Sequence, residues 1–230
     1  MNVEICANSV ASARNAKAGG ATRIELCTHL EVGGLTPAPD EIEYCVHELG
    51  LRTHVLVRPR AGDFCYSDEE YALILQQVEM CRRAGAHAVV VGFLTPDGYI
   101  DEERTRQAVR LAAPMEVTFH RAFDEIRQAP QEALEAIIRC GCHRLLTSGC
   151  APSAEEGIPV IRTLVQQARG RILIMAGAGV TPRNAPRILR ETHVPEIHGS
   201  CKHTLPDGTT ETDATIVKEL LQECSKGCSL

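Results

Sequence analysis

Two short segments of this sequence alternate polar with apolar side chains. In VEIC, Glu4 and Cys6 alternate with two branched apolar residues, and in RIELC, Glu25 and Cys27 alternate with isoleucine and leucine. Residues two apart point to the same side of a β-strand, so these four side chains share one side of the predicted sheet. Carboxylates transfer protons, and thiolates coordinate soft metals such as Cu(I). We therefore predict acid/base roles for the two glutamates and metal ligation for the two cysteines.

A second group of residues has the chemistry to bind and protonate an anion. The segment VRPRAGDFC places Arg58 and Arg60 around a proline, and planar guanidinium groups hold carboxylates and phosphates well. The segment VTFHRAFD brings His120, Arg121 and Asp124 within a few residues of one another. General acid/base catalysis and oxyanion binding use these side-chain types. We predict that the arginines bind the anion and that the histidine and the aspartate move protons.

Glycine, hydroxyl and imidazole groups follow three further apolar segments. Ser148 ends RLLTS, Gly177 and Gly179 lie in IMAGAGVT, and His198 and Ser200 lie in EIHGS. Backbone N–H groups of a glycine-rich turn ahead of a helix can hold a phosphate. The same glycines also suit a tight turn that needs a positive φ. We predict ligand or anion binding by all five residues, with the tight turn as the structural alternative for the glycines.

These candidate residues lie at or near the ends of short β-branched segments. Eight such segments recur, separated by longer stretches with apolar residues at helical spacing. The alternation predicts an α/β fold with a parallel sheet, closed as a TIM (β/α)8 barrel. An open doubly wound sheet is the competing fold, but it usually has a glycine-rich first turn, and ANSVAS stands there instead. The predicted strands are residues 3–6, 23–26, 54–58, 88–92, 115–120, 144–148, 171–175 and 195–199.

The barrel prediction also sets the domain organisation and the place of the site. Residues 1–203 are expected to form the barrel, and residues 204–230 a C-terminal loop and helix packed on it. In such barrels, functional polar residues gather at the C-terminal ends of the strands. Charged side chains inside a barrel are costly unless they are paired. The alternative to a binding site is a self-contained ion network in which Glu4 and Glu25 pair with Arg58.

The overall composition favours a small-molecule or metal ligand and a reducing compartment. A net charge of −6 without a cluster of basic residues argues against binding to nucleic acid or to an anionic membrane. No apolar stretch reaches the roughly 20 residues of a membrane span, and the N-terminus lacks signal-peptide features, so we expect a cytoplasmic protein. The 11 cysteines are odd in number and scattered, which predicts free thiols. A single cysteine is more often a buried small side chain than a metal ligand.

Several long segments, in order along the chain, resemble the CutC copper-homeostasis family. They include VEIC, GGATRIELC, VRPRAGDFCYSDEE, VTFHRAFD, IMAGAGVT and EIHGS, and they cover nearly the whole predicted barrel. The resemblance implies a TIM-type barrel, a cytosolic homo-oligomer (dimer or tetramer) and a link to copper. It also implies copper ligation by cysteines at strand ends, a position that Cys27 matches and that Cys6 and Cys65 share. The segment HGSC departs from the family's usual sequence and adds Cys201.

Two functions are consistent with these residues. The first is copper homeostasis, with Cu(I) bound by Cys6 and Cys27, whose backbones lie about 5–7 Å apart if the two strands are in register. The alternative is a TIM-barrel enzyme that acts on a small anionic or phosphorylated metabolite at the C-terminal face of the barrel. In the enzyme, Arg58 and Arg60 hold the anion and His120 is the acid/base group. The sequence names no reaction for it.

Overall fold

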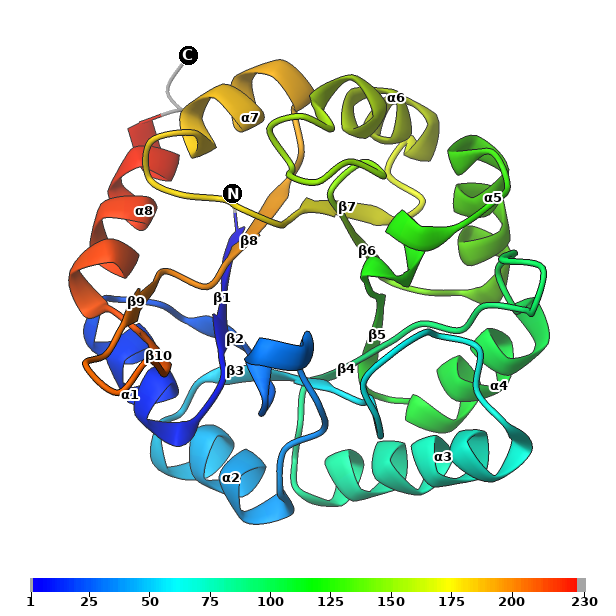
Figure 1. Cartoon of the computed structure of the whole chain (residues 1–230), viewed down its shortest axis with the longest axis horizontal. Coiled ribbons are helices and arrows are strands. Elements are labelled where there is room, and N and C mark those ends of the chain that lie inside the picture. The colour runs from blue at the N-terminus through cyan, green and yellow to red at the C-terminus, as the bar shows by residue number, and fades with distance from the viewer. Residues whose placement is uncertain (1, 227–230) are drawn as a thin grey trace.

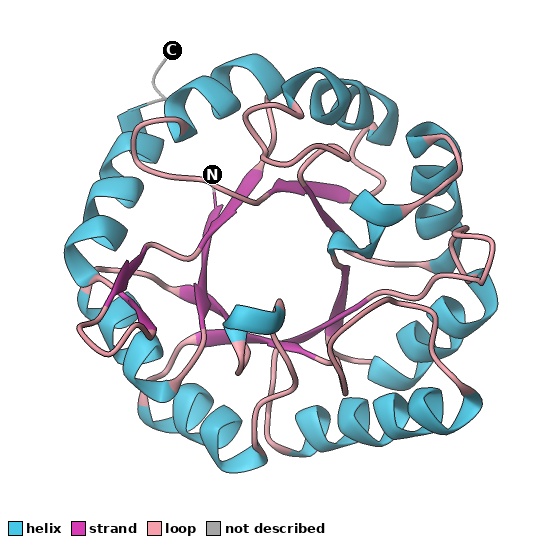
Figure 2. Ribbon diagram, viewed as in Figure 1, coloured by secondary structure: helices cyan, strands magenta, loops and turns pink. Residues whose placement is uncertain are grey.

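The computed structural model describes residues 2–226 and contains a closed barrel of eight parallel strands (Figure 1). Each strand pairs with its neighbours in the sequence, and β8 closes the barrel against β1. The helices form a ring outside the strands (Figure 2). The predicted TIM-barrel fold is therefore confirmed. The strands are β1 (Asn2–Ala7), β2 (Arg23–Leu26), β3 (Arg52–Leu56), β4 (Ala88–Val91), β5 (Glu116–Phe119), β6 (Arg144–Thr147), β7 (Leu173–Ala176) and β8 (Glu196–Gly199).

The helices begin and end where the sequence supplies caps. At the start of α3, Ser67 accepts a hydrogen bond from the Glu70 N–H, and the Glu70 carboxylate accepts one from the Ser67 N–H. Helix α5 ends at Gly141, whose φ of +85° suits glycine. None of the helices within residues 2–226 has the length and apolar character of a membrane span. The helices are α1 (Val10–Ala18), α2 (Pro39–Glu43), α3 (Asp68–Arg83), α4 (Glu102–Ala112), α5 (Pro130–Cys140), α6 (Ile158–Ala168), α7 (Ala185–Thr192) and α8 (Ala214–Lys226).

Two regions differ from the sequence-based expectation. The apolar spacing over residues 39–49 predicts one helix, but in the structure α2 continues into a wider π-helical turn at Tyr44–Glu48. The expected loop after residue 203 is a short antiparallel hairpin of β9 (Lys202–Thr204) and β10 (Thr210–Thr212). Its turn contains Gly208 at a φ of +85°. Helix α8 then lies between α7 and α1 and completes the ring (Figure 1). The last four residues of the expected C-terminal segment, 227–230, lie outside the described part.

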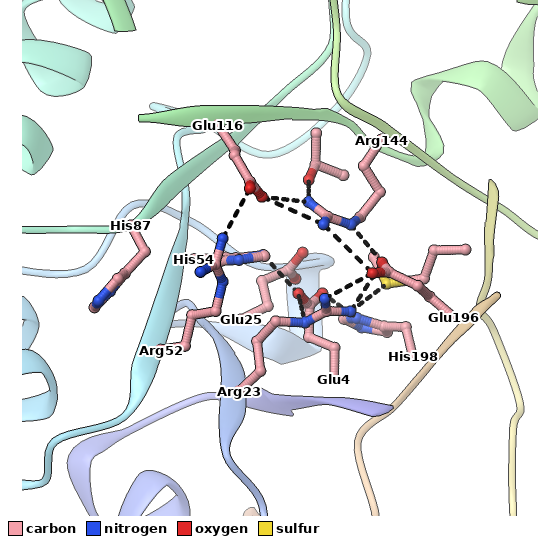
Figure 3. A network of polar contacts seen from close by, with 12 residues as sticks. Glu4, Arg23, Glu25, Arg52, His54, His87, Glu116, Arg144, Glu196 and His198 are labelled. Atoms are coloured by element: carbon pink, nitrogen blue, oxygen red, sulfur yellow. Dashed lines mark hydrogen bonds and ion pairs between the residues drawn. The ribbon is translucent and has the colours of Figure 1, made fainter. Parts of the chain in front are cut away.

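Ion pairs fill the N-terminal half of the barrel interior (Figure 3). Glu196 of β8 binds Arg23 of β2 and Arg144 of β6. Arg144 also pairs with Glu116, which in turn pairs with Arg52 at the end of the barrel. Because barrel interiors usually consist of branched apolar side chains, this network is a departure from the common pattern. The apolar core lies instead between the strands and the surrounding helices.

Candidate functional site

A cavity of about 1450 Å³ opens at the C-terminal ends of the strands. Its wall includes residues that follow six different strands, which is where barrels usually carry their sites. The predicted site residues that line it are Cys6, Glu25, Arg58, His120, Arg121, Asp124, Gly179, His198 and Ser200. The predicted residues outside its lining are Glu4, Cys27, Arg60, Ser148 and Gly177.

The two predicted thiol ligands lie side by side beneath this cavity. Cys6 on β1 is opposite Glu25 on β2, and Cys27 follows directly after β2. Their Sγ atoms are 3.9 Å apart, and both side chains are almost fully buried. The contact with Cys27 and burial raise the pKa of the Cys6 thiol well above its ordinary value. A metal that binds this pair must therefore displace protons from it.

Glu25 is a buried carboxyl group with few partners. Its Oε1 atom lies 4.0 Å from the Cys6 Sγ, and within residues 2–226 its Oε2 atom has no hydrogen-bond partner. Burial raises the pKa of Glu25 to about 7, and the charge of Glu4 adds to the effect. A carboxyl group with such a pKa can donate or accept a proton near neutral pH. It can also become a metal ligand.

His198 is held in place by a carboxylate below it (Figure 3). Its Nδ1 lies 3.0 Å from Glu4 Oε1, while Glu4 Oε2 lies 2.7 Å from His54 Nδ1 and 3.1 Å from Arg23 Nε. Burial acts to raise the pKa of Glu4, but His54 and His198 hold it well below its usual range. Burial acts to lower the pKa of His198, yet Glu25, Cys6 and Glu4 hold it well above its ordinary value. Glu4 is thus a charged support for the ring of His198.

His120 has the opposite protonation state. Its Nδ1 accepts a hydrogen bond of 3.1 Å from the Ala122 N–H, so the ring proton is on Nε2. Burial, helped by the charge of Arg58, lowers the pKa of His120 to about 3. Within residues 2–226, Nε2 is buried without a hydrogen-bond partner. The ring fits only because Gly92 lacks a side chain, since a Cβ there would lie 2.4 Å from it.

The two predicted anion-binding arginines have different partners. Arg58 donates to the carbonyl oxygens of Val32, Gly34 and Gly62 at 2.7–3.1 Å. The alternative in which it pairs with Glu4 and Glu25 is wrong, because the guanidinium is directed to these carbonyls. Arg60 pairs with Glu70 and Asp63, which shape the loop before α3. Of the two, only Arg58 reaches the cavity.

Other predicted residues support the loops around the cavity. Asp124 accepts hydrogen bonds from the N–H groups of Ser148 and Cys150 and pairs with Arg121. These bonds give Asp124 a structural role and leave Arg121 half-exposed at the cavity. Ser148 lies outside the lining, and its hydroxyl donates to the carbonyl oxygen of Ala151, which does line the cavity. Gly177 leaves room mainly for Leu146, because a Cβ there would lie 2.5 Å from the Cδ1 of Leu146 and 3.3 Å from the Cβ of His198.

The remaining predicted residues differ in their access to the cavity. Gly179 has a φ of +67°, which agrees with the tight turn that the sequence left open. Ser200 and Cys201 line the cavity, and Cys201 has a φ of +45°. Cys65 lies outside the lining and donates its N–H to Asp63.

Comparison with known proteins identifies the family. The sequence model of the CutC family matches residues 1–203. This chain belongs to the CutC family. It is 47% identical over 206 residues to a family protein CutC of Porphyromonas gingivalis, covering 90% of this chain and 83% of the relative. It is 41% identical over 224 residues to the human copper homeostasis protein cutC homolog, covering 97% and 82%.

A solved structure from the CutC family agrees with the fold. The crystal structure of a CutC protein from Streptococcus agalactiae has a TM-score of 0.82 to this chain at 32% identity. The match covers 87% of this chain and 98% of the other. A thiamine phosphate pyrophosphorylase from Pyrococcus furiosus, at 17% identity and a TM-score of 0.65, shares the barrel fold alone.

The sequence reasoning missed the polar residues at the start of the strands. Arg23 lies two residues before Glu25, and Glu116 lies two residues before Thr118. Likewise, His54 lies four residues before Arg58, and it is fully buried against Glu4. All three lie an even number of residues before a predicted site residue of the same strand, so the two-residue strand period gave a signal for them. They were not predicted, because functional residues of such barrels are expected at the C-terminal ends of the strands.

Proposed function

We propose that this chain is a copper-homeostasis protein that binds Cu(I) as its cargo through the thiolates of Cys6 and Cys27. The observation that carries the proposal is the 3.9 Å separation of the two Sγ atoms, of which Cys6 lines the cavity and Cys27 lies just outside its lining. Thiolates are the ligands that Cu(I) prefers. The name of the human relative, a copper homeostasis protein cutC homolog, points to the same metal.

The distance between the sulfur atoms suits a bridging ion. Metal–sulfur bonds of about 2.3 Å, as found for zinc, separate two sulfur atoms by at most about 4.6 Å. The Cys6 and Cys27 sulfur atoms need to part by about 0.7 Å or less to reach that limit from 3.9 Å. Small rotations of the two side chains are enough for such a change.

A covering segment, residues 28–35, controls access to the thiols in this proposal. Leu30 packs against the cluster that contains Cys6 and Cys27. Gly34 lies so close that a Cβ on it would be 3.5 Å from the Cys27 Sγ. Arg58 holds the segment down through two of its carbonyl oxygens. Copper therefore reaches Cys27 when the covering segment lifts, which makes exchange slow.

Cys27→Ser tests the copper proposal. Protein purified under reducing conditions is titrated against a chromophoric Cu(I) chelator, and the variant is expected to lose tight binding while it keeps its melting temperature. Cys140→Ser is the matched control, because Cys140 is a buried cysteine at the end of α5, away from the cavity. Equal Cu(I) affinity of the wild type and Cys27→Ser would contradict copper coordination at the barrel mouth.

A second candidate function is an enzyme that acts on a small anionic or phosphorylated metabolite. The observation that favours it is the neutral His120, whose buried Nε2–H lacks an acceptor within residues 2–226. Buried polar groups normally have partners, so an oxyanion is a suitable occupant. Arg121 at the same cavity offers a positive charge, and Glu25 offers a group that can transfer a proton. The cavity of about 1450 Å³ is also far larger than a bare ion needs.

His120→Gln tests this second candidate. Wild-type protein is screened against phosphorylated and carboxylated metabolites, and those that bind raise its melting temperature. The variant keeps a hydrogen-bonding side chain of similar size, so it should remain folded and lose most of that increase. If no anion raises the melting temperature of the wild type, the enzyme candidate is rejected.

We also propose a cytoplasmic location and a homo-oligomer. Thiols at 3.9 Å without a disulfide fit a reducing compartment. The homo-oligomer follows from the family resemblance alone, and light scattering of the purified protein tests it.

A further inference from the structure

The donor atoms around Cys6 extend beyond the second thiol. The Cys6 sulfur, a Glu25 carboxylate oxygen and a His198 ring nitrogen all lie within 4.8 Å of one another. A carboxylate is a poor ligand for Cu(I), which two or three soft ligands satisfy. The three donors are, however, the set that zinc takes in proteins.

We propose that Cys6, Glu25 and His198 form a site for a divalent cation of the zinc type, distinct from the Cys6–Cys27 copper site and sharing one ligand with it. Zinc bonds of about 2.0–2.3 Å in a tetrahedron place donor atoms roughly 3.3–3.8 Å apart. The three atoms therefore need to approach by about 1 Å from their present limit of 4.8 Å. Side-chain rotation supplies this movement.

The strands hold these donors in a fixed arrangement. His198 is on β8, Cys6 on β1 and Glu25 on β2, which are neighbours in the closed barrel. In the parallel register, Glu4 is opposite His198 and Cys6 is opposite Glu25. Donors on adjacent strands of a barrel are positioned more rigidly than donors on loops.

Glu4 orients His198 for metal binding. The Glu4 carboxylate lies 3.0 Å from Nδ1 and is itself fixed by Arg23 and His54 (Figure 3). A histidine ligand usually donates its other N–H to a carboxylate in this way, which fixes the tautomer. Nε2 is then the nitrogen that is left for a cation.

The Glu25 carboxyl group, which has an oxygen without a hydrogen-bond partner in residues 2–226, also supports a cation site. Glu25 Oε2 is buried without a hydrogen-bond partner in residues 2–226, and such atoms are rare in native proteins. Two negative charges, from the Cys6 thiolate and the Glu25 carboxylate, match the charge of a divalent cation. Three protein ligands leave a fourth tetrahedral position open. Because Cys6, Glu25 and His198 all line the cavity, that position is open to water or to an oxygen of a small anion.

Mutations distinguish the two proposed metal sites. Cys27 is not part of the zinc site and lies under the covering segment, so Cys27→Ser should lose Cu(I) and keep Zn²⁺. His198→Gln and Glu25→Gln should weaken Zn²⁺ binding at least tenfold and leave Cu(I) binding unchanged. Affinities are measured by competition with a chromophoric chelator for each metal. Circular dichroism confirms that each variant is folded.

Cobalt substitution gives a second readout on the unaltered chain. Co²⁺ bound to one thiolate, one imidazole and one carboxylate should show a thiolate charge-transfer band and strong tetrahedral visible bands. Absence of a tetrahedral Co²⁺ spectrum in the wild type would overturn the inference. So would wild-type Zn²⁺ affinity in both His198→Gln and Glu25→Gln, or loss of Zn²⁺ together with Cu(I) in Cys27→Ser. If Cys27→Ser retains both metals, the copper proposal fails and the zinc inference stands.

Discussion

Two histidines at the barrel mouth are in opposite protonation states, and their neighbours explain the difference. Burial and the nearby Arg58 lower the pKa of His120 to about 3, so its ring is a neutral hydrogen-bond donor. The carboxylates of Glu4 and Glu25 hold the pKa of His198 well above its ordinary value in spite of burial. Residue type alone gives neither result, because the sign of each shift depends on the charges that surround the ring.

Glu4→Gln tests whether Glu4 acts through His198. Glutamine keeps the size of the side chain and can still accept from Nδ1, but it lacks the charge that strengthens the bond. Loss of such a supporting carboxylate typically weakens metal binding about 10- to 100-fold. We therefore expect weaker Zn²⁺ binding with unchanged Cu(I) binding at Cys6 and Cys27, measured by chelator competition. Equal weakening of both metals would show a general disturbance of the barrel and contradict the positioning role.

At the scale of the elements, the two-residue period of the strands made most of the site predictable. It placed Cys6 and Glu25 on one side of neighbouring strands, and the structure has them opposite each other. It did not predict the partners of Arg58, because these are backbone carbonyl oxygens, two of them on the covering segment, and backbone oxygens carry no sequence signal. The hairpin of β9 and β10 was missed for a similar reason. Its three-residue strands are polar and have no alternating pattern.

Arg58→Met tests the role of the covering segment, residues 28–35. Arg58 makes three hydrogen bonds to carbonyl oxygens, two of them on this segment. Hydrogen bonds from a charged donor contribute about 1.5–3 kcal/mol each, and about 1.4 kcal/mol corresponds to a tenfold change in an equilibrium. We expect Cys27 in the variant to react with iodoacetamide at least tenfold faster, as followed by peptide mass spectrometry.

Arg60→Met is the matched control for this experiment. Arg60 is two residues away and also donates to carbonyl oxygens, but its partners lie in the loop before α3 and at Glu70 in the first turn of α3. Its loss should leave the labelling rate of Cys27 close to that of the wild type. Equal acceleration in both variants would mean that the covering segment does not depend on Arg58.

At the scale of the whole molecule, the polar barrel interior divides into two layers with different properties. The layer near the N-terminal ends of the strands is a set of ion pairs, in which Glu196 pairs with both Arg23 and Arg144 (Figure 3). The layer above it contains Glu25 and His120, whose buried polar atoms lack partners within residues 2–226. The lower layer thus stabilises the fold, and the upper layer has the groups that can bind a ligand, as in barrels generally.

The lower layer should make the protein sensitive to acid. Burial acts to raise the pKa of Glu196, but Arg23 and Arg144 lower it from 4.5 to about 2. A carboxyl group with a lowered pKa in the folded state stabilises the fold above its unfolded pKa and loses this contribution as the pH falls. The shift corresponds to roughly 3 kcal/mol of unfolding free energy, lost between about pH 4.5 and 2. Urea unfolding at a series of pH values measures how the free energy of unfolding changes with pH.

Glu196→Gln should remove that part of the pH dependence and destabilise the barrel at pH 7. Two buried guanidinium groups lose the carboxylate that they share, so that Arg23 keeps only Glu4 and Arg144 keeps only Glu116. Removing one partner of a buried ion pair costs about 3–5 kcal/mol. Glu135→Gln is the matched control, because Arg171 also holds the pKa of Glu135 at about 2, but this pair lies on the surface. Solvent screens the surface pair, so the control should change stability little. If both variants lose the same free energy of unfolding, burial does not strengthen the ion pairs of Glu196. The ion pairs inside the barrel then stabilise the fold no more than those on its surface.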